Sequence, residues 1–209
     1  MNRRELGQKF ARLTTDAVMR SPRLWRAFRP LMRWQFDAIA SEWDAMRMED
    51  SFAPYEAALA AVDPAPARAL DLGTGTGHGA FTIARRFPAV EVVGVDLSDR
   101  MLAEARRKLP VELSDRVRFE RADASALPYG DGSFDLVAHA NMIPFFDELA
   151  RVAAPGGQVL FAFSSGATTP IYVSPERLRN ELERRGFTDF ADFNAARGTS
   201  LLARKRDHA

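Results

Sequence analysis

The sequence predicts an α/β protein whose core is a doubly wound, mostly parallel sheet of seven strands, preceded by a helical extension. Short runs rich in apolar and β-branched residues alternate with longer segments of helical periodicity through the middle of the chain. This alternation indicates βαβ units and therefore a parallel sheet. A glycine-rich loop at residues 73–79 stands where the first buried strand turns into a helix, and its glycines let the backbone approach a ligand closely.

The first part of the chain is predicted to form amphipathic helices. Residues 3–47 have helical periodicity with a break at Ser21-Pro22, and a further helix is expected at about residues 52–62. Apolar stripes run along the two halves of the first segment: Leu6, Phe10, Leu13 and Ala17, then Trp25, Met32, Phe36, Ile39, Trp43 and Met46. The Asp63-Pro64-Ala65-Pro66 break separates these helices from the rest. We therefore expect a helical extension or lid at residues 1–62 and the main domain at residues 63–209.

The main domain is expected to hold the strands of the sheet. They are predicted at residues 67–72, 90–95, 117–120, 134–138, 158–163, 187–193 and 199–203. Helices are predicted at residues 77–87, 99–109 and 175–185, the last of them closed by Gly186. The last two strands are expected to pair as a hairpin at the edge of the sheet.

Composition limits the class of protein. The 209 residues are 46% hydrophobic and 27% charged, which suits one globular domain with a modest extension. Because cysteine is absent, disulfides, thiolate metal sites and a cysteine nucleophile are excluded, and we expect no metal site. The chain has no apolar stretch near the roughly 18 residues of a membrane span, and its arginine-rich start is unlike a secretory signal, so a cytoplasmic protein is expected.

The charge is unevenly distributed along the chain. Residues 1–34 carry a net charge of +7, which leaves −6 for the rest of a chain whose total is +1. Five arginines flank two aromatic residues in a pattern that suits peripheral contact with an anionic membrane: Arg20, Arg23, Arg26, Arg29 and Arg33 around Trp25 and Phe28. A solvated helix face, a packing element and an oligomer contact are the alternatives.

Three acidic side chains follow the first three strands. Asp71 lies two residues before Gly73, Asp96 ends the second strand, and Asp123 follows the third. A carboxylate at Asp71 favours a cationic amine beside the loop and disfavours a pyrophosphate. Asp96 can accept both hydroxyls of a ribose, and the pair Asp123-Ala124 suits the edge of an adenine.

The same loop also allows a dinucleotide interpretation. Residues 75–80 satisfy the G-x-G-x-x-A variant of the dinucleotide fingerprint, and a carboxylate on a ribose fits either cofactor. An NAD-dependent oxidoreductase is therefore one alternative, although no Tyr-x-x-x-Lys or His-Asp pair is evident for it. A cofactor-binding regulator without catalysis is another, because a binding motif can persist without chemistry.

Five segments occur in a recognisable order: Asp71-Leu72-Gly73-Thr74-Gly75-Thr76-Gly77, Val95-Asp96-Leu97-Ser98, Arg121-Ala122-Asp123-Ala124, Ser133-Phe134-Asp135-Leu136-Val137 and Arg151-Val152-Ala153-Ala154-Pro155-Gly156-Gly157. Together they resemble the ordered motifs of class I S-adenosylmethionine-dependent methyltransferases. The resemblance covers residues 66 to about 204 and is closest to the small-molecule group that includes the ubiquinone and menaquinone methyltransferases. Residues 36–44 are similar to the segment that precedes the domain in that group.

The resemblance implies a Rossmann-like methyltransferase fold, S-adenosylmethionine as cofactor and a quinone-, phenol- or lipid-like acceptor. It also assigns cofactor-binding residues. Gly73, Thr74, Gly75 and Gly77 would border the methionine part and Asp71 would support its ammonium group. Asp96 would hold the ribose, Leu97 would pack on the adenine face, and Asp123 with Ala124 would meet the adenine edge. The segment His139-Ala140-Asn141 would line the methyl donor.

A general base is optional in methyl transfer, because the donor already carries the activation. If the acceptor must lose a proton, His139 is the candidate catalytic base, since it follows the fourth strand at the cofactor edge. His78, on the glycine loop, is expected to shape the cofactor pocket instead. We expect no nucleic-acid partner, because the sequence contains no recognisable RNA-binding module. The acceptor, the methylated atom and the oligomeric state are not encoded in any motif.

Overall fold

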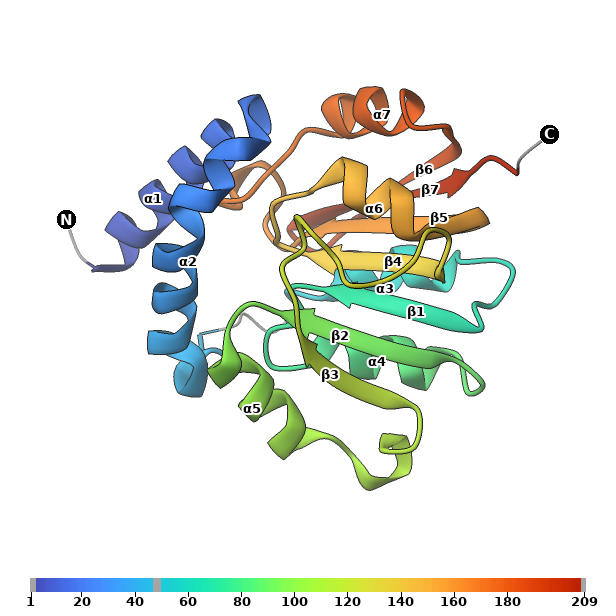
Figure 1. Ribbon diagram of the computed structural model, residues 1–209, viewed down its shortest axis with the longest axis horizontal. Helices are drawn as coiled ribbons and strands as arrows, with labels where there is room; N and C mark the ends of the chain where they lie inside the picture. Colours follow the sequence, from blue (N-terminus) through green and yellow to red (C-terminus); the bar gives the residue numbers. More distant parts are fainter. Residues whose placement is uncertain (1–2, 47–49, 208–209) are drawn as a thin grey trace.

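A computed structural model describes residues 3–46 and 50–207, and it contains a seven-stranded sheet with helices on both faces (Figure 1). The strands lie in the order β3-β2-β1-β4-β5-β7-β6. Strands β1 to β5 pair in parallel, whereas β7 pairs antiparallel with β5 and β6. The predicted doubly wound, mostly parallel sheet and its terminal hairpin are confirmed. The bounds are β1 Arg68–Leu72, β2 Glu91–Asp96, β3 Val117–Arg121, β4 Phe134–Ala140, β5 Ala153–Phe163, β6 Phe187–Ala195 and β7 Gly198–Lys205.

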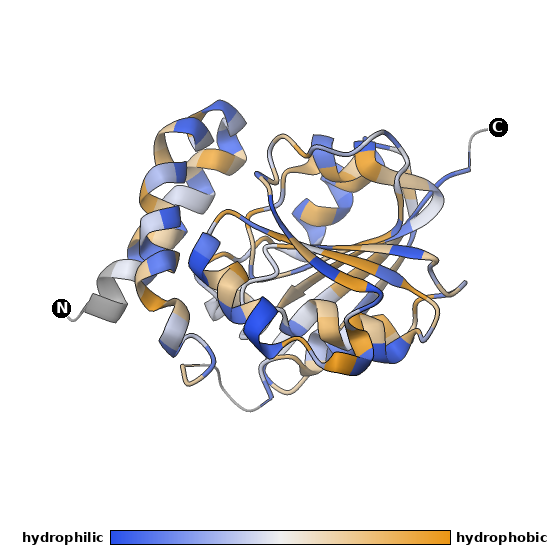
Figure 2. Ribbon diagram, turned by 60° about the horizontal axis from the view of Figure 1, so that its bottom comes forward, coloured by the Kyte–Doolittle hydropathy of each residue, from blue (hydrophilic) through white to orange (hydrophobic). Residues whose placement is uncertain are grey.

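Helices cover the two faces of the sheet in two separate apolar clusters. Helices α3 (Ala53–Ala60), α4 (His78–Arg86) and α5 (Asp99–Lys108) pack on one face. Helices α6 (Phe146–Val152) and α7 (Pro175–Glu183) pack on the other. Figure 2 shows apolar strands in orange between helices whose turns alternate between orange and blue. The sequence pattern had predicted no helix at α6, and β5 begins five residues earlier than expected.

Helix α3 is part of the main core. Tyr55 and Leu59 are buried, and the helix packs against β5, β6 and β7. In addition, Ser200 of β7 donates a hydrogen bond to the carbonyl of Pro54 at 2.6 Å. The boundary expected between residues 62 and 63 would therefore assign to the extension a helix that packs with the sheet.

The N-terminal helices α1 (Arg3–Arg20) and α2 (Trp25–Ile39) lie across the carboxyl ends of the parallel strands (Figure 1). Short 3-10 turns follow each of them, at Pro22–Leu24 and Ala40–Glu42. Together the two helices form a third apolar cluster with residues from the loops after β2, β4 and β5, including Leu97, Ile143 and Ile171. The extension is therefore docked on the edge of the sheet where parallel α/β folds bind ligands.

The apolar stripes expected on these helices are partly wrong. Leu13 is 68% exposed and Met46 is 44% exposed, whereas Thr14 and Thr15 are buried. Helix α1 docks through the turn that contains Arg12, whose guanidinium donates to the carbonyls of Ala167 and Thr169 at 3.1 and 3.2 Å. Ala11 and Val18 are buried with the two threonines, so this side of α1 faces the domain. The side chain of Leu6 lies outside the described residues.

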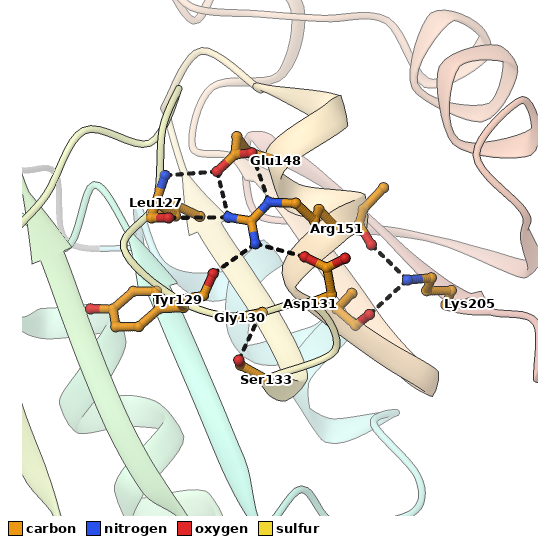
Figure 3. Close-up of polar contacts among 10 residues, drawn as sticks. Leu127, Tyr129, Gly130, Asp131, Ser133, Glu148, Arg151 and Lys205 are labelled. Atoms are coloured by element: carbon orange, nitrogen blue, oxygen red, sulfur yellow. Dashed lines mark hydrogen bonds and ion pairs between the residues drawn. The ribbon is translucent and has the colours of Figure 1, made fainter.

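Arg151 joins the loop between β3 and β4 to helix α6 (Figure 3). Its guanidinium donates to the carbonyls of Leu127 and Tyr129 at 3.1 and 2.6 Å and to the carboxylates of Glu148 and Asp131. Glu148 in turn accepts from the backbone of Leu127 at 2.7 Å, and the Arg151 hydrogen bonds hold the pKa of Glu148 below its usual range. The motif that begins at Arg151 therefore has a structural role, which is to pin the loop that leads into β4 against helix α6.

Candidate cofactor and methyl-transfer site

The glycine loop adopts a backbone that side chains disfavour. Gly73, Gly75 and Gly77 have φ values of +64°, +54° and +90°, the left-handed region. A Cβ added at Gly73 would stand 2.8 Å from Sδ of Met142, and one at Gly77 would stand 2.8 Å from the ring of Phe81. Both conformation and space therefore require glycine, and the loop presents backbone atoms at the carboxyl end of β1.

Asp71 lies beneath this loop rather than on its surface. It is 3% exposed, and its carboxylate accepts hydrogen bonds from Thr74 Oγ1 at 2.7 Å and from the Tyr55 hydroxyl at 3.4 Å. A Cβ at Gly79 would stand 2.6 Å from this carboxylate, so Gly79 makes room for it at the start of α4. Burial raises the pKa of Asp71 to about 7, although hydrogen bonds from Thr74, the backbone of Ala80 and Tyr55 act to lower it.

Asp96 joins the end of β2 to the glycine loop. One carboxylate oxygen accepts from the backbone N–H of Gly75 and the other from the backbone N–H of Ser98, both at 2.9 Å. Burial raises the pKa of Asp96, with hydrogen bonds from the backbone opposing the shift. The structure thus brings Asp71, Asp96 and the glycines into one neighbourhood at the carboxyl ends of β1 and β2.

Asp123 lies beyond β3 but is already engaged by helix α2. Its carboxylate accepts from Trp25 Nε1 at 2.9 Å and from Arg29 at 2.8 Å, and also from the backbone and hydroxyl of Ser125. Burial acts to raise the pKa of Asp123, but the hydrogen bonds outweigh it and the pKa lies below the usual value. Leu97 packs in the same cluster as Met32 and Phe36 of α2. Asp123 and Leu97 are therefore covered by α2, whereas Ala124 packs against the apolar cluster on the α6 and α7 face of the sheet.

Further residues of the extension contact the site and were not predicted to do so. Asp37 accepts from Ser98 Oγ at 2.6 Å, and Asp44 accepts from Thr76 Oγ1 at 2.7 Å. The indole nitrogen of Trp43 lies 3.7 Å from the position of a Cβ at Gly75. The signal was present in the sequence, because residues 36–44 are the segment that resembles the lead-in to the methyltransferase domain.

His139 is enclosed within the sheet. It pairs with Leu72 of β1 and Phe161 of β5, is fully buried, and meets the Phe161 ring edge-on at 4.5 Å. Both ring nitrogens lack a hydrogen-bond partner within the described residues. Burial lowers the pKa of His139 to about 3, so the ring is neutral at physiological pH. His139 was expected to follow the fourth strand at the cofactor edge, whereas it lies within β4 because that strand continues to Ala140.

The other residues expected near the methyl donor tie strands together. Asn141 has a left-handed φ of +52°, and its side-chain oxygen accepts from the backbone of Ser164 at 2.9 Å. Ala140 is partly buried against the α3–α5 face of the sheet. His78 begins α4 and contacts the ring of Phe52 at 4.3 Å. In the ranges that the structure describes, no three His, Asp or Glu side chains gather in a way that could hold a metal ion.

The seven-stranded order and the glycine loop at the end of β1 define the class I methyltransferase type of α/β protein. Comparison with known proteins agrees with this class. Residues 69–157 match a family model described as a methyltransferase domain. The chain is therefore similar to class I S-adenosylmethionine-dependent methyltransferases of the quinone group, as the sequence motifs predicted.

Two curated relatives illustrate the range of this family. A demethylmenaquinone methyltransferase of Thermus thermophilus is 42% identical over 137 residues, which are 60% of this chain and 62% of that protein. A trans-aconitate 2-methyltransferase of Methylobacterium nodulans is 35% identical over 155 residues, 68% of this chain and 57% of that protein. The chain thus spans about three fifths of the length of the curated relatives that it matches.

Solved structures share the fold. A chain in the complex of the Haloferax volcanii Trm112 methyltransferase activator with a methyltransferase superimposes with a TM-score of 0.71 at 20% identity, covering 85% of this chain and 98% of that one. Human N-acetylserotonin methyltransferase in complex with S-adenosylmethionine gives a TM-score of 0.61 at 19% identity, covering 74% and 52%. At these identities the likeness concerns the fold alone.

Proposed function

We propose that this chain transfers a methyl group from S-adenosylmethionine to a small-molecule acceptor of quinone, phenol or lipid character. The observation that carries the proposal is the loop of left-handed glycines at the end of β1, bordered by Asp71 and Asp96. The curated relatives differ in acceptor by name, and the quinone-like class rests on the demethylmenaquinone methyltransferases among them.

The residues of this edge fit the proposed cofactor. Gly73, Gly75 and Gly77 carry no Cβ that would keep the methionine part from the backbone, and the buried carboxylate of Asp71 beneath the loop attracts a cation. Asp96, which already positions Gly75, keeps further lone pairs for ribose hydroxyls. When bound, S-adenosylmethionine supplies a methyl group activated by its sulfonium. The protein then aligns the acceptor with the methyl group and excludes water.

The extension is proposed to act as a lid over this site. Both carboxylate oxygens of Asp123 accept from α2, through Trp25 and Arg29. Oδ1 of Asp123 accepts from Trp25 and Ser125, and Oδ2 accepts from Arg29, so helix α2 stands over the carboxylate that the adenine edge would approach. Opening and closing of α2 would then accompany cofactor exchange, and the closed state would keep water from the methyl group.

His139 can act as a base only if ligand binding exposes its buried ring. With a pKa of about 3, the enclosed ring takes a proton poorly from a phenol or enol. The role therefore requires that cofactor or acceptor binding open the surroundings of the ring. Otherwise positioning alone supports the transfer.

We also propose that the basic extension contacts an anionic membrane peripherally, with residues different from those expected. Trp25 is only 7% exposed and therefore cannot insert into lipid in this arrangement. In the described ranges, no helix is long and apolar enough to cross a membrane.

Ligand-dependent melting tests the cofactor proposal. At a concentration of 100 times its dissociation constant a ligand stabilises by about 2.7 kcal/mol, which is roughly 5 to 10 °C for a domain of this size. S-adenosylmethionine should produce this shift and NAD should not. The reverse pattern would overturn the proposal in favour of an oxidoreductase. Binding without methyl transfer to quinone precursors, phenols or lipids would instead favour the regulator.

A further inference from the structure

The outward side of α2 carries an apolar stripe that no other part of the described protein covers. We call the outer stripe the set Leu24, Ala27, Leu31, Trp34 and Ala38. These positions recur at helical spacing and so share one side of the helix. Leu24, Leu31 and Trp34 are 45%, 47% and 67% exposed. Single exposed apolar residues are ordinary, but a tryptophan within a continuous stripe indicates a surface that has a partner.

The inner side of the same helix is satisfied without these residues. Trp25 and Met32 are buried, and Phe28 and Phe36 pack in the same cluster. Helix α2 therefore carries apolar residues on a buried side and on an exposed side. Docking of α2 on the domain accounts for one side only.

Free cations adjoin the outer stripe. Arg20, Arg23 and Arg26 are exposed and form no ion pair within the described part of the chain. By contrast, Arg29 is bound to Asp123, and Arg33 lies near Asp37 and Asp99. Residues 1–34 carry +7 and the remainder −6. The apolar stripe thus borders unneutralised positive charge on the side of the molecule that faces away from the acidic body.

We infer that the outer stripe of α2, with Arg20, Arg23 and Arg26, docks the protein on an anionic lipid bilayer. A helix that combines apolar residues, a tryptophan and adjacent arginines lies in the interface plane, where anionic headgroups attract the cations and the apolar side chains insert. The negative body is repelled by the same surface, which orients α2 toward the lipid. A second copy fits less well, because a symmetric contact would oppose these arginines to their own copies.

Vesicle sedimentation at low salt tests this inference without any methyl-transfer assay, so failure here is distinct from failure of the proposed function. Wild-type protein should bind vesicles that contain about 30% phosphatidylglycerol and should not bind vesicles of pure phosphatidylcholine. Replacing Leu31 and Trp34 by serine should weaken binding about tenfold or more, from the lost apolar burial. The matched control is Val111→Ser, because Val111 is 87% exposed and lies before β3.

Charge removal gives an independent readout. Each arginine near an anionic surface contributes about fivefold to affinity, so Arg20→Gln, Arg23→Gln and Arg26→Gln together should weaken binding about a hundredfold. The blue shift of tryptophan fluorescence on vesicle addition should disappear in Trp34→Phe, since Trp25 is buried against Phe145 and Trp43 packs between Phe36 and the glycine loop. Circular dichroism and melting temperature should match wild type in every variant.

Three results would overturn the inference. The first is equal binding to neutral and anionic vesicles, or none to either. The second is an equal loss of binding in Val111→Ser. The third is a dimer in vesicle-free solution that Leu31→Ser with Trp34→Ser converts to monomer, since the outer stripe would then be covered by a second copy.

Discussion

The carboxylate of Asp71 should make cofactor binding depend on pH. It is buried beneath the glycine loop with a pKa raised to about 7, and only its ionised form attracts a cationic ligand. At pH 6 about a tenth of the apo protein would have Asp71 ionised, and at pH 7.5 about three quarters. Because affinity scales with the competent fraction, S-adenosylmethionine should bind about eightfold more tightly at pH 7.5 than at pH 6.

Isothermal titration calorimetry at both pH values measures this ratio. Asp71→Asn cannot ionise, and its single carbonyl oxygen keeps an acceptor for Thr74 or Tyr55, which donate to different oxygens of Asp71. Cofactor binding by this variant should therefore be weaker and nearly independent of pH. Asp115→Asn is the control, since Asp115 is exposed and precedes β3 at the opposite edge of the sheet from the loop. The same pH profile in wild type and Asp71→Asn would refute the reasoning.

The raised pKa of Asp71 also predicts how the stability of the apo protein depends on pH. Since the pKa is higher in the folded state than the ordinary 3.8, the folded protein binds the proton more tightly than the unfolded chain. The contribution is thus fully present below about pH 4 and is lost as pH rises through about 7. Asp71→Asn should therefore be more stable than wild type at pH 8, with a smaller difference near pH 5. Urea unfolding at pH 5 and pH 8 measures this difference. A wild type at least as stable as Asp71→Asn at pH 8 would mean that other interactions offset the burial of the Asp71 charge, and the reasoning would be wrong.

Three other substitutions probe the site. Asp96→Ala should weaken S-adenosylmethionine binding about tenfold to a hundredfold, as expected for loss of a charged hydrogen bond of about 1.5 to 3 kcal/mol; an unchanged dissociation constant would remove Asp96 from the site. His139→Leu replaces two buried, unpartnered ring nitrogens, so thermal unfolding should show a gain of about 1 to 3 kcal/mol, and a base role also requires lost turnover at unchanged cofactor affinity. Greater stability with full turnover would assign His139 to packing. Trp25→Phe removes the hydrogen bond to Asp123, so hydrogen exchange in α2 should accelerate while exchange in β1 and β4 stays as in wild type. Unchanged exchange in α2 would mean that other contacts hold the helix.

Much of the fold followed from local patterns. The strands β1 to β4 lie within a residue or two of the predicted runs, because buried parallel strands are short and apolar and are bounded by turns. Helix α6 escaped prediction because seven residues are too few for a periodic pattern to be recognised. The start of β5 was missed because Pro155 and the two following glycines are unusual in a strand.

The side on which α1 docks could not be read from its pattern. The periodicity grouped Phe10, Leu13 and Ala17, yet the buried turn contains Thr14 and Thr15. Ala11 and Val18 are buried on the same side, and Arg12 donates to carbonyls more than 150 residues away in the chain, so distant segments of the chain define the docked side. Similarly, Asp123 was expected to meet an adenine, whereas it accepts hydrogen bonds from Trp25 and Arg29, which lie more than 90 residues earlier in the chain.

The sequence by itself determined the individual strands, the glycine loop and the acidic residues at the ends of β1, β2 and β3. Those features depend on backbone conformation and on residues adjacent in the chain, which leave a local signal. Tertiary structure alone decided that Asp71 faces a buried space, that His139 is enclosed without a partner, and that α2 covers the adenine side. Burial and long-range hydrogen bonds depend on which distant segments pack together, and no spacing within a single element specifies that.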